Sequence, residues 1–193
     1  LLDVQVTYAK SRSDRIYEDI GKKAWFASAY RYKGDMDLVN AQAKITLNDR
    51  NAITIGADYQ EDHVRGWMIG QRKYKGWDET TYTTGYYVAY QTEPIDNLFF
   101  NANLRLNDRS DFAHEWTGDV SASYLVEPTR TTFKSAIGKG YRAPNPYELM
   151  PLANSAWYWR GNPDLEPETA LTWSVGVNQQ IVEFAQSITE KQR

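Results

Sequence analysis

The residues best suited to ligand chemistry form one short run, Trp157-Tyr158-Trp159-Arg160. Aromatic faces stack on flat ligands, and an arginine neutralises the charge of an anionic one. A structural role fits the same residues, because tryptophan and tyrosine also settle at the headgroup level of a membrane. A second region, with Trp67, Arg72 and Trp77, repeats the combination more weakly. Both regions are therefore predicted to contribute to a ligand surface.

Residues that catalyse reactions or bind metals are sparse. The chain has no cysteine, which removes thiolate nucleophiles, disulfides and cysteine-ligated metals, and it has only two histidines, His63 and His114. A zinc site needs three or four convergent ligands, and no spacing here supplies them. No run resembles a nucleophile elbow or an ordered triad. The sequence thus predicts no enzyme, no cofactor and no metal centre.

One group of acids keeps a calcium site open as an alternative. Calcium prefers carboxylate oxygens, and four acids lie close together in sequence, Asp108, Asp111, Glu115 and Asp119. They lack the spacing of a calcium-binding loop, and solvated loop acids would look the same.

The run Gly138-Lys139-Gly140-Tyr141-Arg142-Ala143 superficially matches a dinucleotide fingerprint. That fingerprint needs a helix directly afterwards to hold the pyrophosphate. Pro144 and Pro146 prevent such a helix. The glycines are therefore assigned to close packing within a strand.

Alternation of apolar and polar residues predicts that strands position these candidates. The clearest case is the apolar series Val39, Ala41, Ala43, Ile45 and Leu47, with polar residues between. Similar alternation predicts eight strands, around residues 2–9, 39–48, 53–60, 86–90, 100–107, 120–126, 131–141 and 171–177.

The connections between these strands differ in length. Tight turns are predicted at Asn48–Asn51, Glu93–Asn97 and Glu127–Thr129, and they alternate with longer connections around residues 11–30, 67–80, 108–115 and 144–168. Short periplasmic turns and longer extracellular loops are typical of transmembrane β-barrels. The polar row Asn40, Gln42 and Lys44 is too hydrated to pack against a second sheet, which disfavours a soluble β-sandwich.

The prediction is an all-β, antiparallel transmembrane β-barrel, with the longer connections on its outer side. The barrel region is expected to be residues 1–181. Residues 182–193 form a tail of uncertain structure, with Ile181, Ala185 and Ile188 at helical spacing.

Composition agrees with a barrel without requiring one. Charged residues are 24% of the 193 and aromatic residues 14%, and the mean hydropathy is −0.67. In barrel strands apolar and polar residues alternate, so their hydropathy averages to a low value such as this one. No window approaches the roughly 18 apolar residues of a membrane helix. The net charge is −3 with scattered basic residues, which disfavours nucleic acid. Any signal peptide is expected to lie outside this chain.

Two short boxes frame the aromatic run, Tyr141-Arg142-Ala143-Pro144 and Asn162-Pro163-Asp164-Leu165. Their order and their loop-sized separation closely resemble the late barrel strands of TonB-dependent outer-membrane receptors, where such boxes frame a long extracellular loop. The resemblance implies a mainly structural role for the box residues, which would pin the loop to the barrel rim.

The resemblance also implies a larger architecture. Receptors of this kind use about 22 strands around a plugged lumen, so this chain would be a C-terminal portion of such a barrel, without the plug domain. The final residues, Glu190-Lys191-Gln192-Arg193, differ from the aromatic-ended strand that usually closes family members. A complete eight-stranded barrel is the alternative.

The function implied by the resemblance is high-affinity uptake of a ferric siderophore or similar metal chelate across the bacterial outer membrane. Energy would come from the TonB complex through a plug domain outside this chain. A cobalamin receptor of the same family and a small anchor or adhesion barrel are the alternatives. Haem-uptake members of this family typically carry a histidine between the two boxes. This sequence has none there, so the resemblance counts against haem as the ligand. Outer-membrane lipid is an expected partner, and a colicin or phage is a further candidate.

Overall fold

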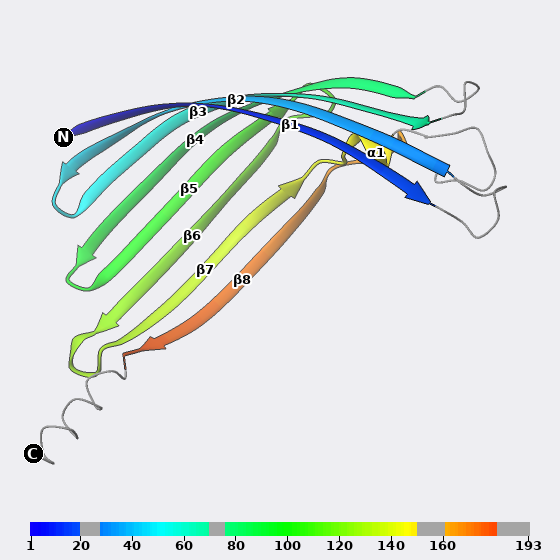
Figure 1. The fold of residues 1–193 in the computed structure, drawn as a ribbon. Helices are drawn as coiled ribbons and strands as arrows, with labels where there is room; N and C mark the ends of the chain where they lie inside the picture. Colours follow the sequence, from blue (N-terminus) through cyan, green and yellow to red (C-terminus); the bar gives the residue numbers. More distant parts are fainter. Residues whose placement is uncertain (20–27, 70–75, 150–160, 181–193) are drawn as a thin grey trace, which may run out of the picture.

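The fold is one antiparallel sheet of eight strands in sequence order (Figure 1). The computed structural model describes residues 1–19, 28–69, 76–149 and 161–180. The strands are β1 (Leu2–Asp19), β2 (Ser28–Asn48), β3 (Asn51–Ile69), β4 (Trp77–Ile95), β5 (Leu98–Arg109), β6 (Glu115–Val126), β7 (Thr131–Arg142) and β8 (Glu168–Gln179). A 3-10 turn (Glu127–Thr129) follows β6, and a short helix α1 (Pro146–Leu149) follows β7. The predicted eight strands are confirmed.

The strand registers line up apolar residues in rows across the sheet. Ala43 lies opposite Ile55, which lies opposite Val88, and Val88 lies opposite Leu104. Directly opposite residues share a face, so these side chains form one apolar row. The neighbouring row, from Gln42 across the sheet to Arg105, is polar and belongs to the other face. The period-two pattern of each strand therefore continues from strand to strand.

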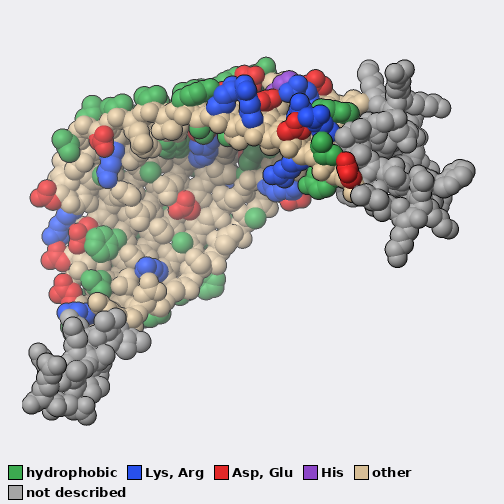
Figure 2. Space-filling view, in the orientation of Figure 1, with side chains coloured by type: hydrophobic (Ala, Val, Ile, Leu, Met, Phe, Trp, Pro, Cys, Tyr) green, Lys and Arg blue, Asp and Glu red, His purple; other side chains and the backbone are tan. Residues whose placement is uncertain are grey.

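The sheet is a single curved layer with a convex and a concave face (Figure 1). Figure 2 looks into the hollow side, and hydrophobic side chains stand out along the convex upper edge. Apolar residues of this face are exposed, among them Val4 at 62% and Trp173 at 70%. In the part of the chain that the structure describes, no large side chain is fully buried. This sheet has no core of its own, which excludes the β-sandwich.

The eight strands do not close into a small barrel. β1 and β8 form opposite edges of the sheet, and each pairs with one neighbour. The alternative of a complete eight-stranded barrel is therefore not supported. An open wall is the architecture that remains.

The strands are longer than predicted at the end where β1, β3, β5 and β7 finish, which we call the loop end. β1 continues to Asp19, β3 ends at Ile69, and β4 begins at Trp77. The predicted connections at 11–30 and 67–80 were thus wrong in part, and the one at 108–115 begins after Arg109.

The physical reason is that polar residues in these extensions bond across the strands. On the convex face, Asp14 carboxylate oxygens lie 2.5 Å from Arg31 Nη2 and 3.5 Å from Lys33 Nζ. Asp35 lies 2.8 Å from Arg65 Nη2. Charge here marks the end of the apolar band rather than the end of the strand.

The opposite end of the sheet has the tight turns that the sequence predicted. Between β2 and β3, Asn48 Oδ1 accepts a hydrogen bond from Arg50 N at 3.0 Å. Asn97 adopts a left-handed φ of 67° between β4 and β5, a conformation that asparagine tolerates well. Its side chain donates to Glu127 of the next turn at 3.0 Å. Polar contacts therefore link adjacent turns.

Among the described residues there is no helix with the length and apolar character to span a membrane. Several predicted features fall outside those residues, namely the tail 182–193 with Ile181, Ala185 and Ile188, the run Trp157, Tyr158, Trp159 and Arg160, and Arg72. The boundary at residue 181 stays a prediction.

Candidate ligand site on the concave face

Trp67 and Trp77, which the sequence grouped together, lie on opposite faces of the sheet. Counting by twos along β3 places Trp67 with Ile55 on the convex face, where its ring lies 5.8 Å from Arg31 Cζ. The same counting along β4 places Trp77 with Tyr87 on the concave face. Only one of the two tryptophans therefore faces the hollow of the sheet.

Trp77 belongs to a cluster of three aromatic rings at the loop end of the concave face. Tyr32 lies 6.4 Å from Trp77 between ring centroids, and Tyr17 lies 5.8 Å from Tyr32 in an edge-on arrangement. These separations are within the favourable range for aromatic pairs. Tyr17 is 57% exposed, so the cluster presents aromatic surface to the hollow.

Gly66 allows the indole of Trp77 to lie flat across β3. Gly66 is buried and lies opposite both Tyr32 and Trp77. A Cβ atom at this position would lie 2.5 Å from Trp77 Cε2, closer than two carbons can approach. Glycine is therefore the residue that lets Trp77 reach Tyr32 across the intervening strand.

Arg15 adds a positive charge to the aromatic cluster. It is exposed, lies opposite Tyr32 in the register of β1 and β2, and therefore shares the concave face. Within the described ranges, its side chain makes no ion pair or hydrogen bond. A guanidinium beside three rings can bind an anionic ligand with flat aromatic groups. We call Arg15, Tyr17, Tyr32 and Trp77 the rim cluster.

The sequence prediction missed Arg15, Tyr17 and Tyr32. Arg15 and Tyr17 fell in the predicted connection 11–30, and Tyr32 was not assigned to a strand. No local signal would have found the first two, because the alternation of apolar and polar residues ends at Tyr8. The register of β1 with β2 places Arg15 and Tyr17 on the concave face.

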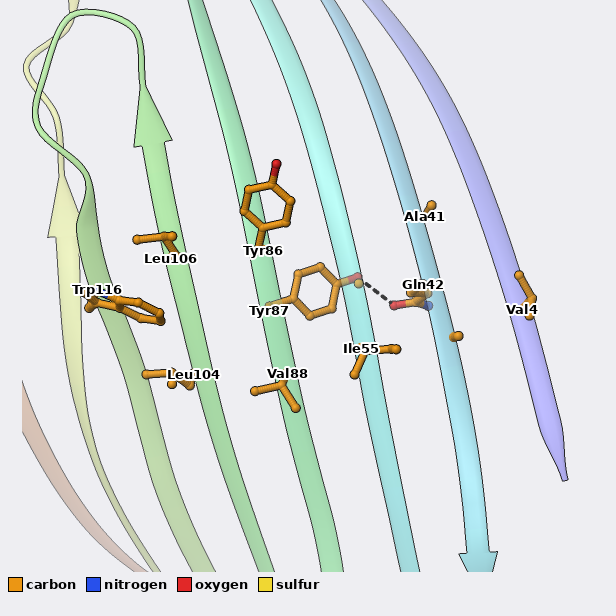
Figure 3. Close-up of a pocket in the computed structure, with 12 residues that line it drawn as sticks. Val4, Ala41, Gln42, Ile55, Tyr86, Tyr87, Val88, Leu104, Leu106 and Trp116 are labelled. Carbon is orange, nitrogen blue, oxygen red and sulfur yellow. Dashed lines mark hydrogen bonds between the residues drawn. The ribbon is translucent and has the colours of Figure 1, made fainter.

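Farther along the concave face, polar side chains bond to one another. Tyr87 Oη donates to Gln42 Oε1 at 3.1 Å (Figure 3) and accepts from Asn40 Nδ2 at 3.2 Å. Asp58 accepts two hydrogen bonds from the Arg105 guanidinium, at 2.6 and 2.8 Å. Arg105 Cζ also lies 5.8 Å from the centroid of the Tyr87 ring. This network satisfies its own polar groups, so it is a structural wall rather than a ligand surface.

Replacing Asp58 by alanine should destabilise the fold by about 1–2 kcal/mol, because Arg105 would lose a two-point, charge-assisted partner in a partly buried setting. Asp58 is 13% exposed and Arg105 32%. The measurement is the free energy of unfolding of the full-length protein in urea. Asp3→Ala is the matched control, an exposed acid on the same face, and an equal loss in both variants would contradict the assignment.

A cavity of about 610 Å³ lies along β1 to β6 (Figure 3). Most side chains that line it belong to the convex, apolar rows, among them Ile55, Tyr86, Val88, Leu104 and Trp116. None of its lining residues is charged. An anionic chelate would find no charged partner there. We therefore assign this cavity to the convex, apolar face and not to the ligand site.

Three of the four acids considered for calcium have separate partners. Asp111 pairs with Arg109 at 2.8 Å, and Glu115 pairs with Lys139 at 3.0 Å. Asp119 accepts hydrogen bonds from Asn103 at 3.0 and 3.1 Å. In the ranges that the structure describes, no three histidines or acids are arranged to hold a metal ion. The geometry gives calcium no support at these acids.

The two sequence boxes come together at the loop end of β7 and β8. Arg142 forms an ion pair with Glu148 of α1, and its Nη1 lies 3.5 Å from Glu168 Oε2 at the start of β8. Asn162 N donates to the carbonyl oxygen of Glu148 at 2.8 Å. Pro144 is buried, and its carbonyl oxygen accepts from Arg109 Nη1 at 3.3 Å. Residues from both boxes thus meet at α1.

The second box is a turn built on Asn162. Its Oδ1 accepts from Asp164 N at 3.0 Å, and its carbonyl oxygen accepts from Leu165 N at 3.3 Å. Asparagine is favoured in turns because its side chain bonds the backbone two residues ahead. The turn leads the chain from the loop into β8.

Comparisons with known proteins point to one class. A family model described as TonB dependent receptor-like, beta-barrel, matches residues 2–187. The ferric enterobactin receptor PirA of Pseudomonas aeruginosa is 24% identical over 208 residues, covering 88% of this chain and 28% of that receptor. This chain therefore spans less than a third of the curated relative.

Solved structures show the same fold. The siderophore receptor PirA from Pseudomonas aeruginosa matches with a TM-score of 0.67 at 18% identity, covering 91% of this chain and 37% of that one. The copper transporter OprC matches with a TM-score of 0.71 at 13% identity, covering 90% of this chain and 32% of that one. At these identities the likeness is one of fold.

Proposed function

The chain belongs to the TonB-dependent receptor β-barrel family, and from that premise we propose that it forms part of the wall of an outer-membrane receptor for a ferric siderophore or similar chelate. The convex face would contact outer-membrane lipid, and the concave face would line the lumen. The bare apolar rows on one side and the polar, self-bonded rows on the other support this orientation. The loop end would then face the outside of the cell.

The rim cluster is the feature of the structure that supports a ferric catecholate as the ligand. Trp77, Tyr32 and Tyr17 offer flat faces at the loop end, and Arg15 offers an exposed guanidinium from the strand position opposite Tyr32. Stacking on planar rings and neutralising negative charge are the two needs of a ferric catecholate. The curated relative PirA is named as a ferric enterobactin receptor, so ferric enterobactin is the first probe to use.

Transport itself would require parts outside this chain. A plug domain and the TonB complex would supply gating and energy, as the family membership implies. The predicted loop residues Trp157, Tyr158, Trp159 and Arg160 remain candidate partners of the rim cluster in binding. Cobalamin stays the alternative ligand, and the preference for a catecholate rests on the rim cluster.

Replacing Arg15 by alanine should weaken the binding of ferric enterobactin to the full-length receptor about tenfold. The reason is the loss of one charge-assisted contact, worth about 1.5 kcal/mol. The dissociation constant can be followed by quenching of tryptophan fluorescence in detergent.

Arg12 provides the matched control, since it lies on β1 three residues away but on the convex face, 3.2 Å from Asp35. Arg12→Ala should leave the affinity within about twofold. Equal losses from the two variants would show that the concave face is not selective for the ligand.

A further inference from the structure

Glu148 contacts both boxes that frame the β7–β8 connection. Its carboxylate forms an ion pair with Arg142 of the first box, and its carbonyl oxygen accepts from Asn162 N of the second box at 2.8 Å. One residue thus reaches the incoming strand by its side chain and the outgoing segment by its backbone.

The place of Glu148 is fixed by a reciprocal pair of hydrogen bonds with Asn145. Glu148 N donates to Asn145 Oδ1 at 3.1 Å, and Asn145 N donates to Glu148 Oε2 at 2.8 Å. This is a capping box, in which the cap residue and the third helical residue bond each other's backbone. Pro146 occupies the first helical position, where its missing N–H costs nothing.

α1 has only four residues, too few for a helix to be stable through its own hydrogen bonds. The contacts of Glu148 and Asn145 therefore decide where α1 lies, and α1 is where the second box attaches. The Arg142–Glu148 pair alone would contribute little, since Arg142 is 53% exposed. What matters is that one carboxylate serves the cap and the ion pair together.

We propose that Glu148 is a positioning residue that holds the two ends of the β7–β8 connection together. The consequence for ligand affinity rests on the proposed function, because the connection carries the predicted residues Trp157 to Arg160. Glu148 itself need not touch the ligand. Its effect would pass through the spacing of the two boxes.

The ionisation of Glu148 gives this role a pH dependence. The N–H of Asn145 and then the Arg142 guanidinium lower the pKa of the Glu148 carboxyl from its ordinary value of 4.5. A carboxyl whose pKa is lowered on folding stabilises the folded state fully above that ordinary value. This stabilisation is lost as the pH falls through the lowered pKa, so the two ends should be held at neutral pH and released in acid.

The direct test is a distance measurement in the full-length receptor. This chain has no cysteine of its own. In a receptor with any cysteines elsewhere replaced by serine, spin labels at Leu149→Cys and Glu166→Cys report the separation between α1 and the second box. We expect a narrow distance distribution at pH 7 that broadens in Glu148→Ala and broadens less in Glu148→Gln, which keeps one acceptor. Acid should broaden the parent distribution and leave that of Glu148→Ala unchanged.

Glu168→Ala is the matched control, because Glu168 is the other acid beside Arg142 and is 74% exposed. It should leave the distribution narrow. An unchanged distribution in Glu148→Ala, or equal broadening in Glu168→Ala, overturns the positioning role.

Ferric enterobactin affinity provides the second measurement. Glu148→Ala should weaken binding about tenfold, the effect of about 1.4 kcal/mol. A broadened distribution with unchanged affinity would overturn the link from spacing to binding. If the parent receptor does not bind this chelate, the catecholate assignment of the proposed function fails, while the distance measurement still decides the role of Glu148.

Discussion

Replacing Trp77 by alanine is expected to weaken the binding of ferric enterobactin about 100-fold, the effect of about 2.7 kcal/mol. Aromatic anchors that become buried when the ligand binds reach this size, and Trp77 is partly buried before binding. The indole supplies its own stacking face and also supports Tyr32, whose ring lies 6.4 Å away. Binding to the full-length receptor by calorimetry or fluorescence would measure the change.

Trp67→Ala is the matched control for Trp77, with the same residue type and the opposite face. Trp67 packs under Arg31 on the convex side, so its loss should change affinity by no more than about twofold. Gly66→Ala gives an independent arm, because the added methyl would meet Trp77 at 2.5 Å and displace the ring without removing it. A large effect at Trp67 with none at Trp77 would reverse the assignment of faces.

The strands could be predicted where each has one apolar face. The alternation over 39–48 and 53–60 identified β2 and β3 and the turn between them, because the apolar band imposes period two. Beyond the band this signal disappears. Arg31, Lys33 and Asp14 continue the strands through ion pairs, and no local feature of the sequence distinguishes such residues from a solvated loop.

The rim cluster could be predicted only in part, for the same reason. Trp77 was identified by residue type, but its face depends on where β4 begins, and that start lies in a predicted loop. Tyr17 and Arg15 come from β1, and Tyr32 comes from β2, so their meeting depends on the register of two extended strands. The residue types indicated the kind of ligand that could bind. The pairing of strands far apart in sequence determined which of these residues lie together.

The start of α1, which Glu148 helps to cap, could have been predicted from local sequence, although it was not. Asn145 and Glu148 are three residues apart with Pro146 between them, the spacing of a capping box before a first-turn proline. The sequence analysis took Pro144 and Pro146 to prevent a helix here, which was wrong for a short one, because Pro146 occupies the first position of α1. The contact with Asn162, across the connection, has no counterpart in local sequence.

Replacing Leu104 by arginine should destabilise the receptor by about 2–4 kcal/mol in lipid vesicles, the cost of placing a charge at the centre of a lipid-facing band. Leu104 lies in the row with Ala43, Ile55 and Val88, midway along the apolar band, and is 48% exposed. Urea unfolding of vesicle-inserted receptor measures the loss.

Asn103→Arg isolates the contribution of the face from that of the added charge. Asn103 is the adjacent residue, projects to the concave face, and already bonds Asp119 at 3.0 Å, so an arginine there gains an acid partner and stays in water. Its cost should be below about 1 kcal/mol. Because the two variants add the same side chain to adjacent positions, a difference in stability reports the medium that each face meets. Equal costs would mean that both faces meet the same medium, and a lumen wall could not then be assigned to either one.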